Sequence, residues 1–167
     1  VMEVRNRNMK DDKIRYPEHK NNRRIKMKKE KNNRDIQQGN VYWVYLTGDE
    51  HEQRGKKPCL VCQNNMGNAH SPNVVVYPLT SKRKKDLPTH VFLPADETGL
   101  PEDSIVLCEN PVSISKSKLG DYMTSLPDKY MAQVAAAALL ASSLISFLDF
   151  DSLFTIREQA IQLNSCK

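Results

Sequence analysis

Two clusters of basic side chains in this sequence are of a type that can contact phosphate. Arg54, Lys56 and Lys57 follow the first apolar segment of the chain, and Lys82–Lys85 follow the hydroxyl pair Thr80–Ser81. Ammonium and guanidinium groups bind phosphate oxygens, and a field of like-signed charge attracts polyanions. Charge alone also suits solvated loops, so the two clusters define a candidate phosphate-contacting surface without naming its ligand.

The cysteines and histidines do not have the spacing of a metal site or of a nucleophilic triad. Cys59 and Cys62 form a CxxC pair, but alternation along a strand would point their side chains to opposite faces. No second CxxC or paired histidine completes a zinc shell. No serine or cysteine stands in a nucleophile elbow beside the four histidines. We therefore expect no metal ion and no cofactor.

Five short apolar segments predict the strands that must position the basic clusters. The segments are rich in β-branched or aromatic residues and are separated by polar loops: Val41–Leu46, Pro58–Cys62, Asn73–Tyr77, Thr89–Leu93 and Ser104–Cys108. Pro78 ends the third segment, since its missing N–H fits a strand end or an edge. No helical pattern separates these segments, so they predict an antiparallel sheet or a small barrel.

The last third of the chain predicts helices. Ser125 can cap a helix that has Pro127 in its first turn, and Tyr130–Leu148 contains no charged residue. A membrane span needs about 20 apolar residues, but Gln133, the serines and the weakly hydrophobic alanines argue against one. We expect one helix here, packed against the sheet or a second subunit, and a separate short helix at Ser152–Leu163.

Length and charge divide the chain into a folded domain and a basic tail. The 167 residues suit one domain. Residues 1–36 hold 13 basic and 6 acidic side chains, a net charge of +7, whereas residues 37–167 hold 12 and 14, a net charge of −2. The first segment has too few apolar residues to fold alone, which predicts a disordered tail, either a solvated appendage or an RNA-tethering arm. Four cysteines and the lack of a signal-peptide pattern favour the cytoplasm.

A series of short strings runs in order through the predicted strands and loops. The strings are Gly39–Val44, Glu52–Asn64, Gly67–Asn68, Ser71–Pro72, Leu79–Ser81, Leu87–Val91, Gly99–Leu100 and Asp103–Glu109. In this order they resemble the MazF/PemK family of toxin endoribonucleases from toxin–antitoxin systems. The resemblance runs from about Gln38 to Phe150. It divides the chain into the tail 1–36, a toxin domain 37–150 and a C-terminal extension 151–167.

The resemblance implies a mainly β fold of the CcdB/PemK-like type, an SH3-like small barrel or bent antiparallel sheet with a C-terminal helix. It implies a homodimer without a membrane segment, and a cognate antitoxin that occupies the RNA groove. The implied activity is that of an mRNA interferase, a sequence-specific and metal-independent endoribonuclease acting on single-stranded RNA. In that reaction the ribose 2′-OH attacks the adjacent phosphate and leaves a 2′,3′-cyclic phosphate and a 5′-OH. Such chemistry needs a base, an acid and support for the phosphorane charge.

The resemblance also assigns roles to single residues. The catalytic arginine of the family falls on Lys57, and its catalytic threonine falls on Thr80. The RNA-contacting glutamine of the family falls on Asn110, which follows Glu109. Glu109 is itself an RNA-binding candidate, and the remaining candidates lie in the two basic loops: Gln53, Arg54, Ser81, Lys82, Arg83, Lys84 and Lys85.

Two of the matched positions depart from the family pattern. Lys57 offers a point charge where arginine presents a planar fork, and Asn110 is one methylene shorter than glutamine. One hypothesis is therefore an active, sequence-specific endoribonuclease. The other is a catalytically weakened relative that binds RNA or an antitoxin peptide, or a gyrase-directed toxin by analogy of fold, although fold alone does not assign function.

Overall fold

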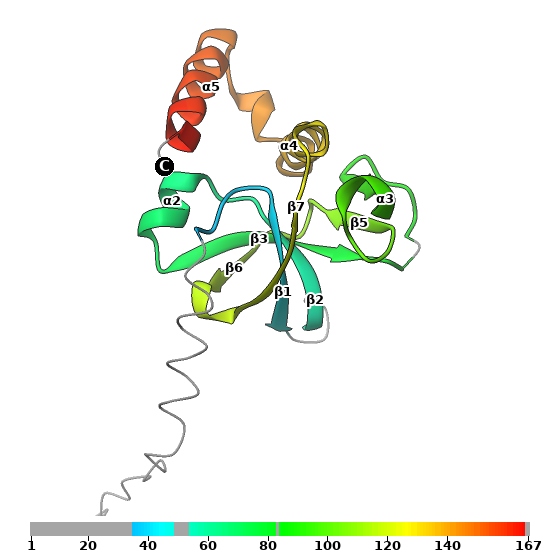
Figure 1. The fold of residues 1–167 in the computed structure, drawn as a ribbon. Helices are drawn as coiled ribbons and strands as arrows, with labels where there is room; N and C mark the ends of the chain where they lie inside the picture. Colours follow the sequence, from blue (N-terminus) through cyan, green and yellow to red (C-terminus); the bar gives the residue numbers. More distant parts are fainter. Residues whose placement is uncertain (1–34, 49–53, 83, 166–167) are drawn as a thin grey trace, which may run out of the picture. The chain divides into compact units, whose positions relative to one another are not determined.

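The computed structural model describes residues 35–48, 54–82 and 84–165, and all of them belong to the unit formed by residues 32–167 (Figure 1). The strands are β1 Asn40–Thr47, β2 Arg54–Val61, β3 Asn73–Thr80, β4 His90–Leu93, β5 Ser104–Leu107, β6 Val112–Ser115 and β7 Leu119–Ser125. The helices are α2 Asn65–His70, α3 Ala95–Thr98, α4 Asp128–Ser142 and α5 Phe150–Ser165, with 3-10 turns η1 Lys116–Lys118 and η2 Leu144–Phe147.

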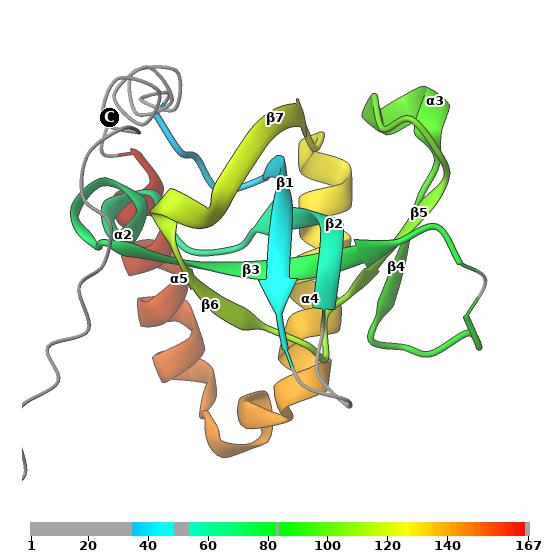
Figure 2. The same cartoon turned by 90° about the horizontal axis from the view of Figure 1, so that it is seen from below.

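The seven strands form one antiparallel sheet that bends along β3, which confirms the predicted fold class. The order across the sheet is β4-β5-β3-β2-β1-β7, and β6 also pairs with β3. Figure 2 shows β3 crossing beneath β1 and β2 and reaching β4 and β5 at its far end. The first half of β3 pairs with β6, whereas Leu79 and Thr80 at its end pair with β5. The strand therefore belongs to two parts of the sheet.

The prediction that Pro78 ends the third strand was wrong, because β3 continues to Thr80. The register explains why a proline is tolerated inside this strand. On one edge of β3, β6 pairs as far as Val76 and β5 begins at Leu79, so that Tyr77 and Pro78 have no paired residue on that edge. A residue without an N–H fits where a strand changes partner.

Two hydrophobic cores cover the two faces of the sheet, and alternation along β1 supplies both. Val41 faces the core between the sheet and α4, which also contains Leu60 and Tyr130. Tyr42 and Val44 face the second core, which β6 and the start of β7 enclose. Ile36, which the sequence analysis assigned to the tail, packs against this second core. The rest of the predicted tail, residues 1–34, lies outside the described residues.

The uncharged segment Tyr130–Leu148 does not form one continuous helix as predicted. α4 begins after Pro127 and ends at Ser142, because Ser143 adopts a left-handed conformation with φ +53°. The prediction that Ser125 caps this helix was wrong, because Ser125 is the last residue of β7 and Pro127 occupies the cap position of α4. Tyr130, Val134 and Ala137 form the buried face of α4. None of the helices in the described ranges is long and apolar enough to cross a membrane.

The predicted short helix at Ser152–Leu163 is present as α5, which extends past both predicted ends. Its end returns to α2 (Figure 1). Asn164 donates a hydrogen bond to Gln38 Oε1 at 2.7 Å and bonds to Asn65 twice, at 3.1 and 3.2 Å. None of the residues of α5 is buried. The helix is therefore held to the domain by polar contacts while most of its large apolar side chains remain exposed.

Candidate active site

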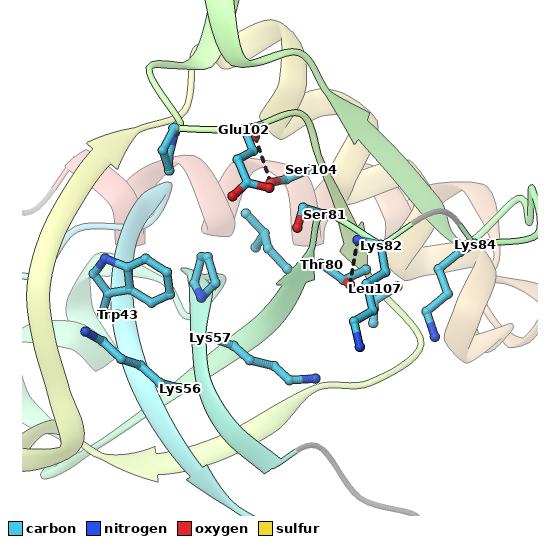
Figure 3. A pocket seen from close by; sticks show the side chains of 13 residues that line it. Trp43, Lys56, Lys57, Thr80, Ser81, Lys82, Lys84, Glu102, Ser104 and Leu107 are labelled. Atoms are coloured by element: carbon cyan, nitrogen blue, oxygen red, sulfur yellow. Dashed lines mark hydrogen bonds between the residues drawn. The ribbon is translucent and has the colours of Figure 1, made fainter.

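An open groove lies between the ends of β2 and β3 and has a volume of about 410 Å³ (Figure 3). It is lined by Trp43, Lys56, Lys57, Pro58, Leu79, Thr80, Ser81, Lys82, Lys84, Pro101, Glu102, Ser104 and Leu107. These residues come from β1, β2, β3 and β5 and from the loops that follow β3 and precede β5. The first and last lining residues in the sequence, Trp43 and Leu107, are more than 60 residues apart, so the fold brings distant parts of the chain together in the groove.

The groove exists because β3 leaves β2 and pairs with β5. The ladder between β2 and β3 ends at the pair Cys59 and Pro78. Continued for two residues, the same register would pair Lys57 with Thr80, but Thr80 instead pairs with Ile105 of β5. The two strands therefore diverge at the residues that the sequence analysis assigned to catalysis, and both side chains line the opening.

The charges in the groove are mostly positive. Among the described residues that line it, Lys56, Lys57, Lys82 and Lys84 are cationic and Glu102 is the one carboxylate. This contrasts with the net charge of −2 carried by residues 37–167 as a whole. A concave surface with an excess of lysines attracts phosphates.

Hydrogen bonds fix both rims of the groove. Thr80 Oγ1 accepts a hydrogen bond from the backbone N–H of Lys82 at 3.2 Å, which turns the chain immediately after β3 (Figure 3). On the opposite rim, Ser104 Oγ donates to the carbonyl oxygen of Glu102 at 3.0 Å. The Thr80 hydroxyl proton is not used in the Lys82 contact, so it can point to a phosphate oxygen.

The structure brings five of the predicted site residues together. Lys57, Thr80, Ser81, Lys82 and Lys84 all line the groove. Four others are described but lie outside the lining, namely Arg54, Lys85, Glu109 and Asn110. Gln53 and Arg83 lie outside the described residues.

Three of the predicted residues outside the lining form a second polar cluster around His90. The ring of His90 contacts the carbonyl oxygen of Lys85 through Nδ1 and Glu109 Oε1 through Nε2, both at 3.1 Å. Asn110 Nδ2 donates to the same Glu109 oxygen at 3.3 Å. The cluster connects the loop after β3 to the turn after β5. The hydrogen bond from Asn110 to Glu109 restrains the Asn110 side chain within this cluster.

Sequence reasoning did not assign Trp43, Glu102 or Ser104 to the site, and it placed Lys56 only in a basic cluster. The alternation of the first strand was a usable signal for Trp43, because it puts this ring on the face opposite Tyr42 and Val44. Glu102 and Ser104 come from the β4–β5 side of the sheet. Their approach to β2 depends on the bend of β3, which no local pattern encodes.

The described cysteines take no part in the groove. Burial raises the pKa of Cys59, Cys62 and Cys108 to about 12, which keeps the three thiols protonated and unreactive at neutral pH. Cys62 Sγ donates to the carbonyl oxygen of Val75 at 3.3 Å. Within the described ranges, no group of three or more His, Cys, Asp or Glu side chains could hold a metal ion.

Comparison with known proteins agrees with this geometry. Residues 37–141 match the family model described as PemK-like, MazF-like toxin of type II toxin-antitoxin system. The chain belongs to this toxin family. Endoribonuclease EndoA from Bacillus subtilis is 38% identical to this MazF-like toxin over 114 residues, which cover 67% of the chain and 98% of EndoA. The family predicted from the ordered strings is therefore confirmed.

Solved structures of the family share the fold. MazF from Deinococcus radiodurans superposes with a TM-score of 0.58 at 26% identity, over 68% of this MazF-like toxin and 99% of that chain. An endoribonuclease from Mycobacterial species, solved in complex with its cognate antitoxin, superposes with a TM-score of 0.55 at 28% identity, over 65% and 96%. The family model ends at residue 141, so η2 and α5 lie beyond it.

Proposed function

We propose that this MazF-like toxin is the endoribonuclease of a toxin–antitoxin system and cleaves single-stranded RNA in the groove between β2 and β3. The observation that carries the proposal is the convergence of Lys57 and Thr80, the positions matching the catalytic pair of the family, in one lysine-rich groove. The name of its relative EndoA supports the same class of activity. RNA as the substrate agrees with a cytoplasmic location.

The lining residues can supply the base and the charge stabilisation that the reaction needs. Glu102 accepts the proton of the ribose 2′-OH, the 2′-oxygen bonds to phosphorus, and the bond from phosphorus to the 5′-oxygen breaks. Lys57 stabilises the negative charge that develops on the departing 5′-oxygen, which takes a proton from water, and the products are a 2′,3′-cyclic phosphate and a 5′-OH end. Thr80 and Lys82 bind the phosphate oxygens and stabilise the charge of the phosphorane. DNA lacks the 2′-OH and is not a substrate.

A second candidate function is that of a binding protein with weakened catalysis. The specific observation in its favour is Lys57 itself, because a lysine grips one phosphate oxygen where the arginine of the family pattern grips two. In this case the groove binds RNA, or an antitoxin segment, without efficient cleavage.

Cleavage of a long single-stranded RNA of mixed sequence in EDTA tests the proposal. We expect discrete fragments with 5′-OH ends from the wild-type protein, and loss of cleavage in Lys57→Ala and Thr80→Ala. Lys118→Ala, at an exposed residue of η1 outside the lining of the groove, is the matched control and should cleave normally. Cleavage that survives both groove substitutions would show that the activity lies elsewhere. Bound but intact RNA would favour the binding protein.

We also propose an antitoxin and a second copy of the chain as partners. The antitoxin is inferred from the related endoribonuclease that was solved with its cognate antitoxin. The second copy is inferred from the exposed apolar side chains of α4 and η2, including Leu139, Leu140, Leu144 and Phe147. Residues 1–36 remain a proposed solvated or RNA-tethering tail.

A further inference from the structure

The end of the groove opposite Lys84 is aromatic instead of purely cationic. Figure 3 shows the Trp43 ring at one end of the lining and the Lys84 side chain at the other, with Lys57 and Thr80 between them. Trp43 is the one aromatic side chain among the described residues of the lining. We propose that a base of the bound RNA, next to the scissile phosphate, stacks on Trp43. This inference rests on the proposed RNA-cleaving function of the groove.

Lys56 marks the ring face as a binding surface. Its Nζ lies over the Trp43 ring, 4.9 Å from the centroid. The register pairs Lys56 with Tyr45 and Trp43 with Pro58, so Lys56 reaches the ring as a diagonal cross-strand neighbour. In the free protein the ammonium therefore occupies a place where a flat, polarisable group can bind.

The backbone of Trp43 is held rigidly, which suits a stacking platform. β1 is paired with β2 on one side and with β7 on the other, and the register with β7 shifts between Tyr42 and Val44. Such irregularities re-aim the side chain at the bulge. Gly120 of β7 approaches this point so closely that an added Cβ would lie 2.7 Å from the Trp43 carbonyl oxygen. The backbone that carries the ring is thus held in place before RNA binds.

A base can displace the ammonium from the ring. Stacking of a nucleic-acid base on an aromatic side chain is stronger than a cation–π contact at an exposed site. Lys56 is exposed and has a long, flexible stem, so it can swing from the ring to a neighbouring phosphate. Binding then exchanges one weak contact for a stacked base and a charge-assisted phosphate contact. A base that stacks on the Trp43 ring holds its nucleotide in a fixed position relative to Lys57 and Thr80.

The single tryptophan of the chain allows a direct test. The probe is a short 2′-O-methyl RNA of mixed sequence that contains every dinucleotide step, which blocks the attacking hydroxyl and prevents cleavage. We expect saturating probe to quench the Trp43 fluorescence of the full chain. Binding measured independently by anisotropy of a labelled probe should weaken between about 5-fold and 150-fold in Trp43→Leu. Trp43→Phe should retain most of the affinity.

Tyr45→Leu is the matched control, because Tyr45 follows Trp43 on the same face of β1, is 65% exposed and lies outside the lining. It should bind the probe with wild-type affinity. Unchanged fluorescence in a complex that anisotropy shows to be saturated would refute stacking while leaving the proposed function intact. Wild-type affinity in Trp43→Leu would do the same. Absence of probe binding in the wild-type protein would overturn both proposals.

Discussion

In the proposed mechanism, Lys57 stands where the family pattern has an arginine, so neighbouring groups in the groove must contribute more of the charge stabilisation. Lys57 is half-buried in β2, and Lys82 and Lys84 approach the same opening from the loop after β3. Several point charges can stabilise a phosphorane that one planar guanidinium would otherwise grip with two hydrogen bonds. Two substitutions in the groove test this arrangement. One asks whether an arginine fits in place of Lys57, and the other asks what Glu102, the one carboxylate of the described lining, contributes among the lysines.

Lys57→Arg is expected to increase kcat/KM for RNA cleavage by about tenfold, the effect of roughly one extra charge-assisted hydrogen bond in the transition state. Initial rates on the mixed-sequence RNA measure the change. Lys118→Arg, on η1 and outside the lining, controls for the general effect of an added guanidinium and should leave the rate unchanged. An unchanged or lower rate for Lys57→Arg would mean that the groove has been reshaped around the ammonium group.

Glu102→Gln should separate binding from chemistry. Without the carboxylate, the groove repels phosphate less, so the affinity for 2′-O-methyl RNA should rise by about two- to fivefold. The cleavage rate should fall by about 100-fold or more, because the 2′-OH loses its base. Asp121→Asn, which removes the charge of an exposed carboxylate on β7, is the control and should change neither the affinity nor the cleavage rate. A variant that binds more tightly and still cleaves at the wild-type rate would remove Glu102 from the mechanism.

At the scale of elements, two junctions position the groove and the helices: the point where β3 changes partner and the point where α4 ends. A residue with a special backbone stands at each junction: Pro78, which lacks an N–H, at the first, and Ser143, which has a positive φ, at the second. Ser143 is the one non-glycine residue with a positive φ among the described residues. Its backbone N–H bonds to the carbonyl oxygens of Leu139 and Leu140, which closes the helix.

Ser143→Gly should raise the free energy of unfolding by up to about 1 kcal/mol, because glycine adopts the left-handed conformation without steric cost. Ser142→Gly, one residue earlier and inside α4, should lower it by about 0.5–1 kcal/mol. Urea denaturation of the two variants measures both values. Opposite signs at adjacent positions are expected, and the same sign for both would contradict the assigned end of the helix.

The contact between α3 and α4 should make stability depend on pH. Glu97 accepts hydrogen bonds from Lys129 and from Tyr130, the latter at 2.7 Å, and the Lys129 contact is the main cause that lowers the pKa of Glu97. A lowered folded pKa means that the contribution is present above the ordinary glutamate pKa and is lost as pH falls through the folded value. Thermal unfolding should show a smaller loss of Tm on acidification in Glu97→Gln than in the wild type. An equal loss would place the acid sensitivity elsewhere.

The elements that sequence patterns predicted are those with strong local signals. All five apolar segments are strands, since β-branched and aromatic runs fix both the type and the approximate position of an element. β6 and β7 were not predicted. The sequence of β6, VSIS, alternates but is only 4 residues long, and the sequence of β7, LGDYMTS, contains a glycine and an aspartate, which are depleted in strands. The groove was predicted in part. Lys57 and Thr80 came from ordered strings, whereas Trp43 and Glu102 join them only through long-range strand pairing.

At the scale of the whole molecule, the main feature is the apolar surface of α4, η2 and α5, of which η2 and α5 lie beyond the family match. Large apolar side chains are exposed along α4, η2 and α5, and Phe147 and Phe150 are exposed by 84% and 83%. Monomeric proteins rarely expose contiguous apolar patches larger than a few hundred Å². A second copy of the chain that covers this surface removes the difficulty.

A mass well above 19.1 kDa is therefore expected in solution. The paired change Leu140→Lys and Phe147→Lys should shift the protein toward the monomer, because two charges cannot be buried without partners. Phe92→Lys, which alters an exposed aromatic residue on β4, is the control. Light scattering after size exclusion reports the mass of each. A monomeric wild-type protein would leave the dimer proposal without support.

The hydrogen bonds among Gln38, Asn65 and Asn164 join the segment that precedes β1 to the C-terminal end of α5. The two ends of the described domain therefore lie side by side, although they are far apart in sequence. A linker that joins α5 to β1 would allow the chain to be opened at another turn while every strand pairing is kept. Such a circular permutant would carry the basic tail at a new site and would show whether RNA binding depends on where the tail is attached.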